Sequence, residues 1–282
     1  MTRYWRENKW HNADFLPMSP TDRGLTHGLG LFETILAIDG SPALLDRHLA
    51  RMLTSCDHLG WGNPLPNNLR PAIISQLAAA KLDQGRARVR LAISAGSGQL
   101  SDPSLGADHH VWITVSRTED PPASITLCKA PFDHPSHSFL AGMKSASYAD
   151  NLLALNDARQ RGFDDALYLN DKIRICETTT SNIFGVMDNT LHYPPDDTGC
   201  LPGITRSLII ELAEKNDIRA SATSLTENDL MTCDEVFITS ALRGVVRVAR
   251  YESTQYTQST VTDKLRELWQ QAVIADAARS KA

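Results

Sequence analysis

Hydrophobic and polar residues follow two different periods along the chain, and the segments with each period occur in no regular order. A period of two predicts strands over residues 32–38, 88–94, 111–116, 124–130, 166–169, 183–187, 191–193 and 235–238. A period near 3.6 predicts helices from about residue 46, from about 71 to 80, and over 152–161, 206–216 and 261–278. Because strands and helices mix without the strict alternation that builds a parallel sheet, the predicted fold class is α+β.

The segment that follows the first strand contains a tight turn. Asp39 and Gly40 come directly after residues 32–38, and both residue types tolerate the positive φ that hairpin turns require. We expect a return strand to start at residues 43–45 and a helix to start near Asp46.

A charged, proline-containing segment divides the chain into two parts. The residues from Arg117 to Pro122 are mostly charged and end in two prolines, which withhold the donors that a strand needs. We therefore expect an N-terminal domain over residues 1–118, a linker over 119–123 and a C-terminal domain over 124–282.

The amino-acid composition and the net charge exclude several classes of protein for this chain. With 42% hydrophobic and 22% charged residues in a chain of 282, the protein is globular. The net charge of −5 argues against a nucleic-acid surface, and no apolar run approaches the ~20 residues that span a bilayer. The first residues lack the apolar core of a secretory signal, and the five cysteines include no CxxC pair. We expect a reduced, cytoplasmic protein with no disulfides, no metal site, and neither nucleic acid nor membrane as a partner.

A lysine with small and apolar neighbours is the first candidate for chemistry. Lys144 lies within residues 141–148, and the first carboxylate after it is Asp150. Desolvation favours the neutral form of a lysine, which is a nucleophile. Taken alone, this segment fits an ordinary structural lysine as well.

Four other segments contain residues that bind anions or orient a ring. They are residues 47–51, residues 177–184, residues 201–206 at the start of a predicted helix, and residues 239–244 at the end of a predicted strand. The start of a helix offers backbone N–H groups and the positive end of the helix dipole, which together favour an anion. Each segment alone also fits a turn, a helix surface or, for Thr205, a helix N-cap.

Taken together, these five segments resemble the class IV (fold type IV) pyridoxal-phosphate enzymes, and the resemblance extends from residues 22–34 to residues 234–237. That superfamily contains branched-chain and D-amino-acid aminotransferases, (R)-amine transaminases and aminodeoxychorismate lyases. The resemblance implies a small α/β N-terminal domain, a larger C-terminal pseudo-barrel domain and pyridoxal 5'-phosphate as cofactor. It also implies a homodimer whose active site lies between the two domains.

The resemblance assigns a role to each matching residue. Lys144 matches the lysine that forms the Schiff base with the cofactor and moves the substrate proton. Glu177 matches the carboxylate that pairs with the ring nitrogen and keeps it protonated. Arg51 matches the arginine that binds the cofactor phosphate, and Tyr148 matches a tyrosine near the phenolic oxygen of the ring.

The remaining cofactor contacts are matched by two pairs of donors. Ile204 and Thr205 match backbone and hydroxyl donors to the phosphate at a helix start. Ser240 and Ala241 match a second pair. Because Ala241 stands where other members have threonine, only its backbone N–H can donate.

The residues expected to bind the substrate differ from those of the D-amino-acid enzymes. D-amino-acid enzymes hold the substrate carboxylate with an arginine and a histidine at positions that here carry Leu100 and Asp102. Arg88 and Arg90 alternate on one strand and therefore point the same way. Two interpretations fit this pair, namely a replacement anchor for the substrate carboxylate and partners of surface carboxylates. The resemblance adds Phe32 and Arg243 as further candidates for substrate binding.

Two activities follow from the resemblance. The first is a transaminase that moves an amino group between an amino acid or primary amine and a 2-keto acid through Lys144. The alternative is an aminodeoxychorismate lyase that releases pyruvate and p-aminobenzoate. Residues 201–206 and 148–154 are closer to transaminases, whereas residues 96–98 and 240–242 are similar to lyases.

Overall fold

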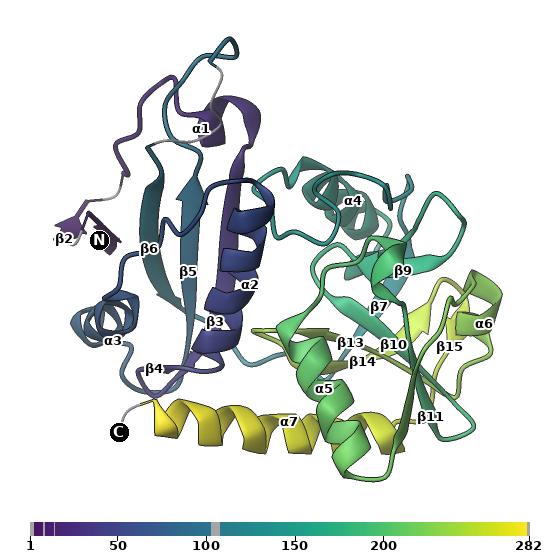
Figure 1. Ribbon diagram of the computed structural model, residues 1–282. Coiled ribbons are helices and arrows are strands. Elements are labelled where there is room, and N and C mark those ends of the chain that lie inside the picture. Colours follow the sequence, from purple (N-terminus) through teal and green to yellow (C-terminus); the bar gives the residue numbers. More distant parts are fainter. Residues whose placement is uncertain (1–2, 8, 14, 103–107, 281–282) are drawn as a thin grey trace. The chain divides into compact units, whose positions relative to one another are not determined.

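The computed structural model describes residues 3–7, 9–13, 15–102 and 108–280, and the chain forms two compact units (Figure 1). The first unit consists of Met1–Asp120, Lys144–Tyr148 and Val273–Ala282, and the second consists of Pro121–Met143 and Ala149–Ala272. The chain thus first leaves the N-terminal unit between Asp120 and Pro121. The segment that contains Lys144 belongs to the first unit, although it lies more than 20 residues beyond that point.

An antiparallel sheet forms the centre of the first unit. In the described part of this unit, six strands lie in the order β2-β1-β6-β5-β3-β4. The strands are β1 (Arg3–Arg6), β2 (Lys9–Asn12), β3 (Gly30–Ile38), β4 (Ser41–Pro42), β5 (Arg86–Ser94) and β6 (His110–Arg117). The accompanying helices are α1 (Arg23–His27), α2 (Leu45–His58) and α3 (Leu69–Ala79).

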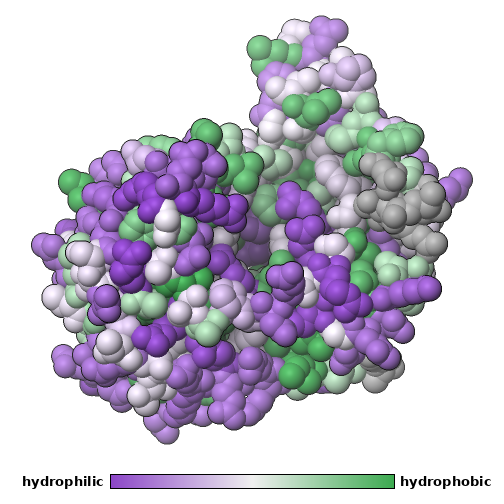
Figure 2. Space-filling model, turned by 180° about the vertical axis from the view of Figure 1, so that it is seen from behind, coloured by the Kyte–Doolittle hydropathy of each residue, from purple (hydrophilic) through white to green (hydrophobic). Residues whose placement is uncertain are grey.

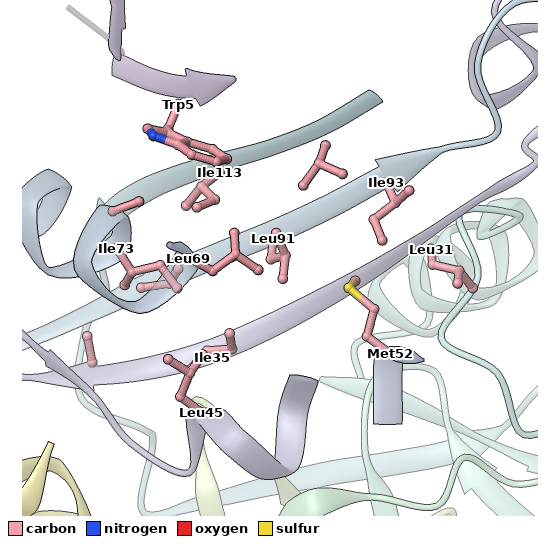
Figure 3. Packing of buried hydrophobic residues seen from close by; sticks show 14 of the residues in the cluster. Trp5, Leu31, Ile35, Leu45, Met52, Leu69, Ile73, Leu91, Ile93 and Ile113 are labelled. Carbon is pink, nitrogen blue, oxygen red and sulfur yellow. The ribbon is translucent and has the colours of Figure 1, made fainter. Parts of the chain in front are cut away.

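One face of this sheet packs against α2 and α3 and forms a hydrophobic core (Figure 3). Strand alternation places Leu31 and Ile35 of β3 on this face, together with Leu91 and Ile93 of β5. Met52 of α2 packs against them. The predicted strands 32–38, 88–94 and 111–116 and the first two predicted helices are confirmed, each with limits that differ by a few residues.

The hairpin after β3 differs from the prediction in one respect. Asp39 and Gly40 have the expected positive φ, at 48° and 79°. The return strand is only Ser41–Pro42, so the strand predicted at residues 43–45 is wrong. Leu44 adopts a left-handed conformation and its N–H donates to Asp276 Oδ2 at 2.6 Å instead of to a strand, and α2 begins at the next residue.

The second unit contains a larger, mixed sheet. Among its described residues, nine strands are paired in the order β12-β11-β10-β13-β14-β7-β8-β9, with β15 paired to β14. The strands are β7 (Ser124–Lys129), β8 (Asp165–Leu169), β9 (Ile175–Thr178), β10 (Asn182–Met187), β11 (Thr190–Tyr193), β12 (Arg219–Ala222), β13 (Glu235–Ser240), β14 (Gly244–Tyr251) and β15 (Thr254–Gln255). The pairs β11·β12, β14·β7 and β7·β8 are parallel and the others are antiparallel.

Three of the helices described in the second unit follow the predicted positions, whereas the short α6 (Glu227–Met231) was not predicted. The three are α4 (Ala149–Gln160), α5 (Ile204–Lys215) and α7 (Thr260–Arg279), whose residues from Val273 onward belong to the first unit, and a 3-10 turn lies at Asp196–Thr198. Gly162 has a φ of 79° just after α4, as expected of a residue that ends a helix. The antiparallel sheet of the first unit and the mixed sheet of the second, with helices in irregular order, confirm the α+β class.

Hydrophilic residues predominate on the surface seen in Figure 2, with hydrophobic residues in smaller groups among them. Within the described ranges, no helix is both long and apolar enough to cross a membrane. All five cysteines are buried free thiols. Burial raises the pKa of Cys56 and of Cys233 to about 12, so these thiols are unreactive.

Candidate active site

The segment that contains Lys144 pairs with the beginning of β3 in the first unit. Phe32 N donates to Lys144 O at 3.0 Å, and Ala146 N donates to Gly30 O at 2.7 Å. Leu31 and Ser145 form an antiparallel bridge between these two bonds. The pairing fixes the backbone of Lys144 next to Phe32.

Two glycines make this close pairing possible. Gly28 has a φ of 65°, and Ser147 Oγ donates to its carbonyl at 3.1 Å. At Gly30, an added Cβ would lie 2.7 Å from the carbonyl oxygen of Ile93. The first glycine is required by its backbone conformation and the second by the approach of two neighbouring strands.

The Phe32 ring brings together three of the predicted side chains of the first unit. Lys144 Nζ lies 4.6 Å from the ring centroid, and Arg90 Cζ lies 3.9 Å from it. Tyr148 packs edge-on against the same ring, with centroids 5.4 Å apart and planes inclined by 81°. A cation over an aromatic face is stabilised by the ring quadrupole, so Phe32 holds both cations in place.

Arg88 and Arg90 lie on the same face of β5, as predicted. Arg90 pairs with Thr34 of β3, and Arg88 pairs with Leu36, so both side chains stand on the sheet face opposite to the core residue Val89. Burial and the nearby charge of Arg88 both lower the pKa of Arg90, while Tyr148 acts in the opposite direction. Among the described residues, no carboxylate forms a salt bridge with either arginine.

Arg51 is fixed by a buried carboxylate on β3. Arg51 Nε donates to Glu33 Oε1 at 2.9 Å, and Arg51 Nη2 donates to Glu33 Oε2 at 2.6 Å. His48 Nδ1 lies 2.7 Å from the same Oε2. Burial by itself raises the pKa of Glu33, but the charge of Arg51 and the hydrogen bonds from His48 and Arg51 outweigh it and lower this pKa to about 2. The guanidinium is therefore held in one orientation by a bidentate ion pair.

We predict that the Glu33→Gln variant loses stability in a pH-dependent manner. Removal of one partner from a buried ion pair costs about 3 kcal/mol or more. Because the pKa of Glu33 is lower in the folded protein than its ordinary value of 4.5, the carboxylate stabilises the fold above about pH 4.5. This stabilisation is lost as the pH falls from there towards about 2. Urea unfolding of wild type and variant across this range should give curves that converge at low pH.

Glu7→Gln is the matched control for this measurement, because Glu7 pairs with Arg6 at 3.0 Å while its side chain is 73% exposed. Exposed pairs contribute about 0–1 kcal/mol, so this variant should unfold like the wild type. A Glu33→Gln protein as stable as the control at neutral pH would contradict the structural role of the pair.

In the second unit, the hydroxyl-rich residues after Glu177 surround a buried carboxylate. Asp165 Oδ2 accepts a hydrogen bond from Thr178 Oγ1 at 3.0 Å, and Asp165 Oδ1 accepts one from Thr179 Oγ1 at 2.5 Å. Thr180 Oγ1 donates to Asp165 Oδ2 at 3.3 Å. The hydroxyl residues therefore form an ordered turn between β9 and β10. Three of their hydroxyl groups donate hydrogen bonds to the Asp165 carboxylate.

Arg243 binds the same turn from the other side. Its Nη2 donates to Thr180 Oγ1 at 2.5 Å and to Ser181 Oγ at 3.0 Å, and it lies 3.5 Å from Asp165 Oδ2. The contacts observed for Arg243 are with this turn. Its role in substrate binding stays a prediction.

Two predicted pairs of donors stand at the ends of neighbouring elements. Ile204 and Thr205 are the first two residues of α5, whose N-cap is Gly203, so the alternative interpretation of Thr205 as an N-cap is wrong. The amides of a first helical turn have no partner within the helix. Ser240 ends β13, and Ala241 begins the turn that follows it.

The loop after β5 contains the two positions at which the sequence departs from D-amino-acid enzymes. Leu100 is 88% exposed. Asp102 Oδ2 accepts from Arg23 Nη2 at 3.0 Å and from Gln99 N at 2.6 Å, so this carboxylate holds the loop against α1. The structure thus gives Asp102 a local structural partner.

With this geometry described, comparison with known proteins assigns the family. The model of the amino-transferase class IV family matches residues 30–251, which is most of the chain. The chain belongs to the class IV aminotransferase family. A protein of Methanocaldococcus jannaschii assigned as a branched-chain-amino-acid aminotransferase is 32% identical over 262 residues, covering 89% of each chain.

Further proteins similar to this chain are named for each of the two predicted activities, aminotransferase and lyase. The aminodeoxychorismate lyase of Bacillus subtilis is 28% identical over 248 residues, covering 85% of this chain and 83% of the lyase. Among solved structures, the branched-chain aminotransferase of Thermoproteus uzoniensis with norvaline superposes with a TM-score of 0.91 at 22% identity, covering 99% of this chain and 97% of that one. The last comparison confirms the predicted fold.

Three residues that were not predicted as site residues hold predicted residues or their neighbours in place. They are Glu33, His48 and Asp165. Glu33 had a detectable signal, since it occupies a core-facing position of β3 between Leu31 and Ile35. A carboxylate in such a position requires a cationic or hydrogen-bonding partner. His48 lies one helical turn before Arg51 in the sequence, whereas Asp165 had no comparable signal.

Proposed function

We infer that this chain is a pyridoxal-phosphate-dependent transaminase that moves an amino group between an amino acid or primary amine and a 2-keto acid. Its membership of the class IV family supports the activity and the cofactor. The observation that carries the proposal is the position of Lys144 Nζ over the Phe32 ring, next to Tyr148 and Arg90.

The residues of the second unit fit the chemistry of the cofactor. Glu177 offers a carboxylate to a ring nitrogen, while the start of α5 and Ser240 offer N–H and hydroxyl donors to a phosphate. When bound, pyridoxal phosphate supplies an electron sink for the carbanion that forms at the substrate Cα. We propose Ile204, Thr205, Ser240 and Ala241 as phosphate contacts, together with Arg51.

Each remaining residue has a distinct proposed action. Lys144 Nζ removes the proton from the substrate Cα and returns it during transfer of the amino group. Glu177 keeps a proton on the ring nitrogen. Tyr148 orients the ring through its hydroxyl. Glu33 holds the Arg51 guanidinium in a fixed direction, which reduces the entropy lost when an anion binds.

Arg88 and Arg90 are the proposed anchor for the substrate carboxylate. Both stand on one sheet face, without a carboxylate salt bridge among the described residues, and Arg90 shares the Phe32 ring with Lys144. A guanidinium binds a carboxylate through two parallel hydrogen bonds. The pair thus offers what the D-amino-acid enzymes obtain from the residues that are replaced here by Leu100 and Asp102.

The assembly and location are finer proposals. We propose a homodimer, supported by the exposed hydrophobic side chains of Leu152 and Leu153 on α4, which are 61% and 60% exposed. We propose a cytoplasmic location, supported by the free thiols.

Single-turnover spectroscopy distinguishes the transaminase from the lyase. The purified holoenzyme is mixed, without keto acid, with separate L-amino acids, D-amino acids and (R)-1-phenylethylamine. We expect at least one donor to convert the yellow cofactor to pyridoxamine phosphate, and addition of a 2-keto acid to restore the yellow form. No conversion by any donor, together with pyruvate release from aminodeoxychorismate, would support the lyase, a possibility that the lyase relative keeps open.

A further inference from the structure

Asn182, the first residue of β10, contacts two of the segments that supply the proposed cofactor residues. Its Nδ2 donates to Glu177 Oε2 at 3.1 Å and to Leu201 O at 2.8 Å. Both donor hydrogens of this amide are thus used, one on the ring-nitrogen carboxylate and one on the loop that leads into α5.

The carbonyl side of the same amide lies against the start of α5. A Cβ added at Gly203, the N-cap of α5, would lie 1.9 Å from Asn182 Oδ1. Gly203 has a φ of −70°, which any residue adopts, so the glycine is required by this close contact and not by its backbone conformation. The amide and the helix start therefore fit each other.

The backbone of Asn182 connects to the third segment. Asn182 pairs with Thr239 in the antiparallel pair β10·β13, and Ser240 is the next residue. Thr239 Oγ1 is buried and has no hydrogen-bond partner among the described residues. One residue therefore touches the carboxylate, the helix start and the strand that ends at the second pair of donors.

We propose that Asn182 is a positioning residue that sets the Glu177 carboxylate at a fixed place relative to the start of α5. The proposal rests on the proposed function, because it gives these two groups the ring nitrogen and the phosphate of one rigid cofactor. The carboxylate of a glutamate turns easily about its last torsion, and a donor on Oε2 restricts that rotation. The bond to Leu201 O transmits the same constraint to α5.

A purely structural asparagine is the competing explanation. In that case the bond to Leu201 O would stabilise the loop, and loss of Asn182 would change the melting temperature without acting through Glu177. The two explanations differ in whether the effect of Asn182 on the rate depends on the charge of Glu177, which a double-mutant cycle measures.

The experiment uses the holoenzyme and the rate of pyridoxamine phosphate formation with one amino donor. The variants are Asn182→Ala, Glu177→Gln and the double variant. We expect Asn182→Ala to slow the rate about tenfold or more in the wild-type background, since hydrogen bonds to charged groups are the strong ones. In the Glu177→Gln background, we expect the same substitution to change the rate less than about twofold.

Asn216→Ala is the matched control. Asn216 Nδ2 donates to Leu212 O at 2.8 Å at the C-terminal end of α5, so the variant removes a similar amide-to-carbonyl bond far along the chain from Glu177. Its rate should stay within about twofold of the wild type. If Asn182→Ala does not fold, Asn182→Leu removes the donors with a side chain of similar shape and adds no charge beside Glu177, and the same cycle is run with it.

Equal rate losses in both Glu177 backgrounds, or an Asn182→Ala rate like that of the control, would overturn the positioning role and leave the transaminase intact. Failure of the wild-type holoenzyme to react with any donor would instead overturn the proposed function itself. A rate loss in the wild-type background that disappears in the Glu177→Gln background supports the proposal.

Discussion

The Lys144→Ala variant is expected to lose transaminase activity by about ten-thousandfold or more. The substitution removes both the amine that holds the cofactor covalently and the group that carries the Cα proton. The contacts of the Lys144 backbone with Phe32 N do not depend on the side chain, so the fold should remain. Steady-state rates and the melting temperature together measure this separation of activity from stability.

Two further variants sharpen the test of Lys144. Lys144→Arg keeps a positive charge next to the Phe32 ring but lacks the nucleophilic amine, so it should be as inactive as the alanine variant. Lys172→Ala removes an exposed lysine and should leave the rate unchanged. Added methylamine should restore part of the activity of Lys144→Ala. An alanine variant that keeps more than about a tenth of the wild-type rate would rule out the assignment of Lys144.

The Glu177→Gln variant is expected to lower kcat about a hundredfold, with a smaller effect on cofactor binding. The amide keeps the shape of the carboxylate and can still accept the hydrogen bond from Asn182, but it has no charge to hold a proton on the ring nitrogen. The substrate Cα proton then becomes harder to remove, because the ring withdraws fewer electrons.

Measurement of kcat and KM separately shows whether the loss lies in the chemical step. Glu214→Gln, which changes an exposed glutamate on α5, is the control with the same change in net charge. If the two variants had equal kcat values, Glu177 would not be the partner of the ring nitrogen.

Local sequence patterns predicted most elements, because these elements bury residues at the spacing of a strand or helix. Strand β14 (Gly244–Tyr251) was missed, although its residues are suitable for a strand, because it follows the predicted 239–244 segment directly. The short strands β1, β2 and β9 were also missed, since four-residue segments carry little periodicity. The return strand predicted at residues 43–45 was wrong because the N–H of Leu44 donates to Asp276, more than two hundred residues away in the sequence.

For the candidate site, too, local sequence predicted single residues but not their contacts with distant parts of the chain. The residues with proposed chemical roles were predicted as individual positions, but the partners that hold them lie far along the chain. Glu33 precedes Arg51 by 18 residues, and Asp165 precedes Thr179 by 14. The contact between Lys144 and Phe32 joins segments more than one hundred residues apart, and no local pattern contains that information.

Reduction of the holoenzyme with borohydride, followed by peptide mass mapping, tests the central claim most directly. Borohydride fixes a cofactor that is bound through a lysine as a stable secondary amine. We predict a phosphopyridoxyl group on the peptide that contains Lys144, and we predict that it is lost when an amino donor is added before reduction. Attachment at a different lysine, or no attachment to a yellow and active protein, would contradict the account.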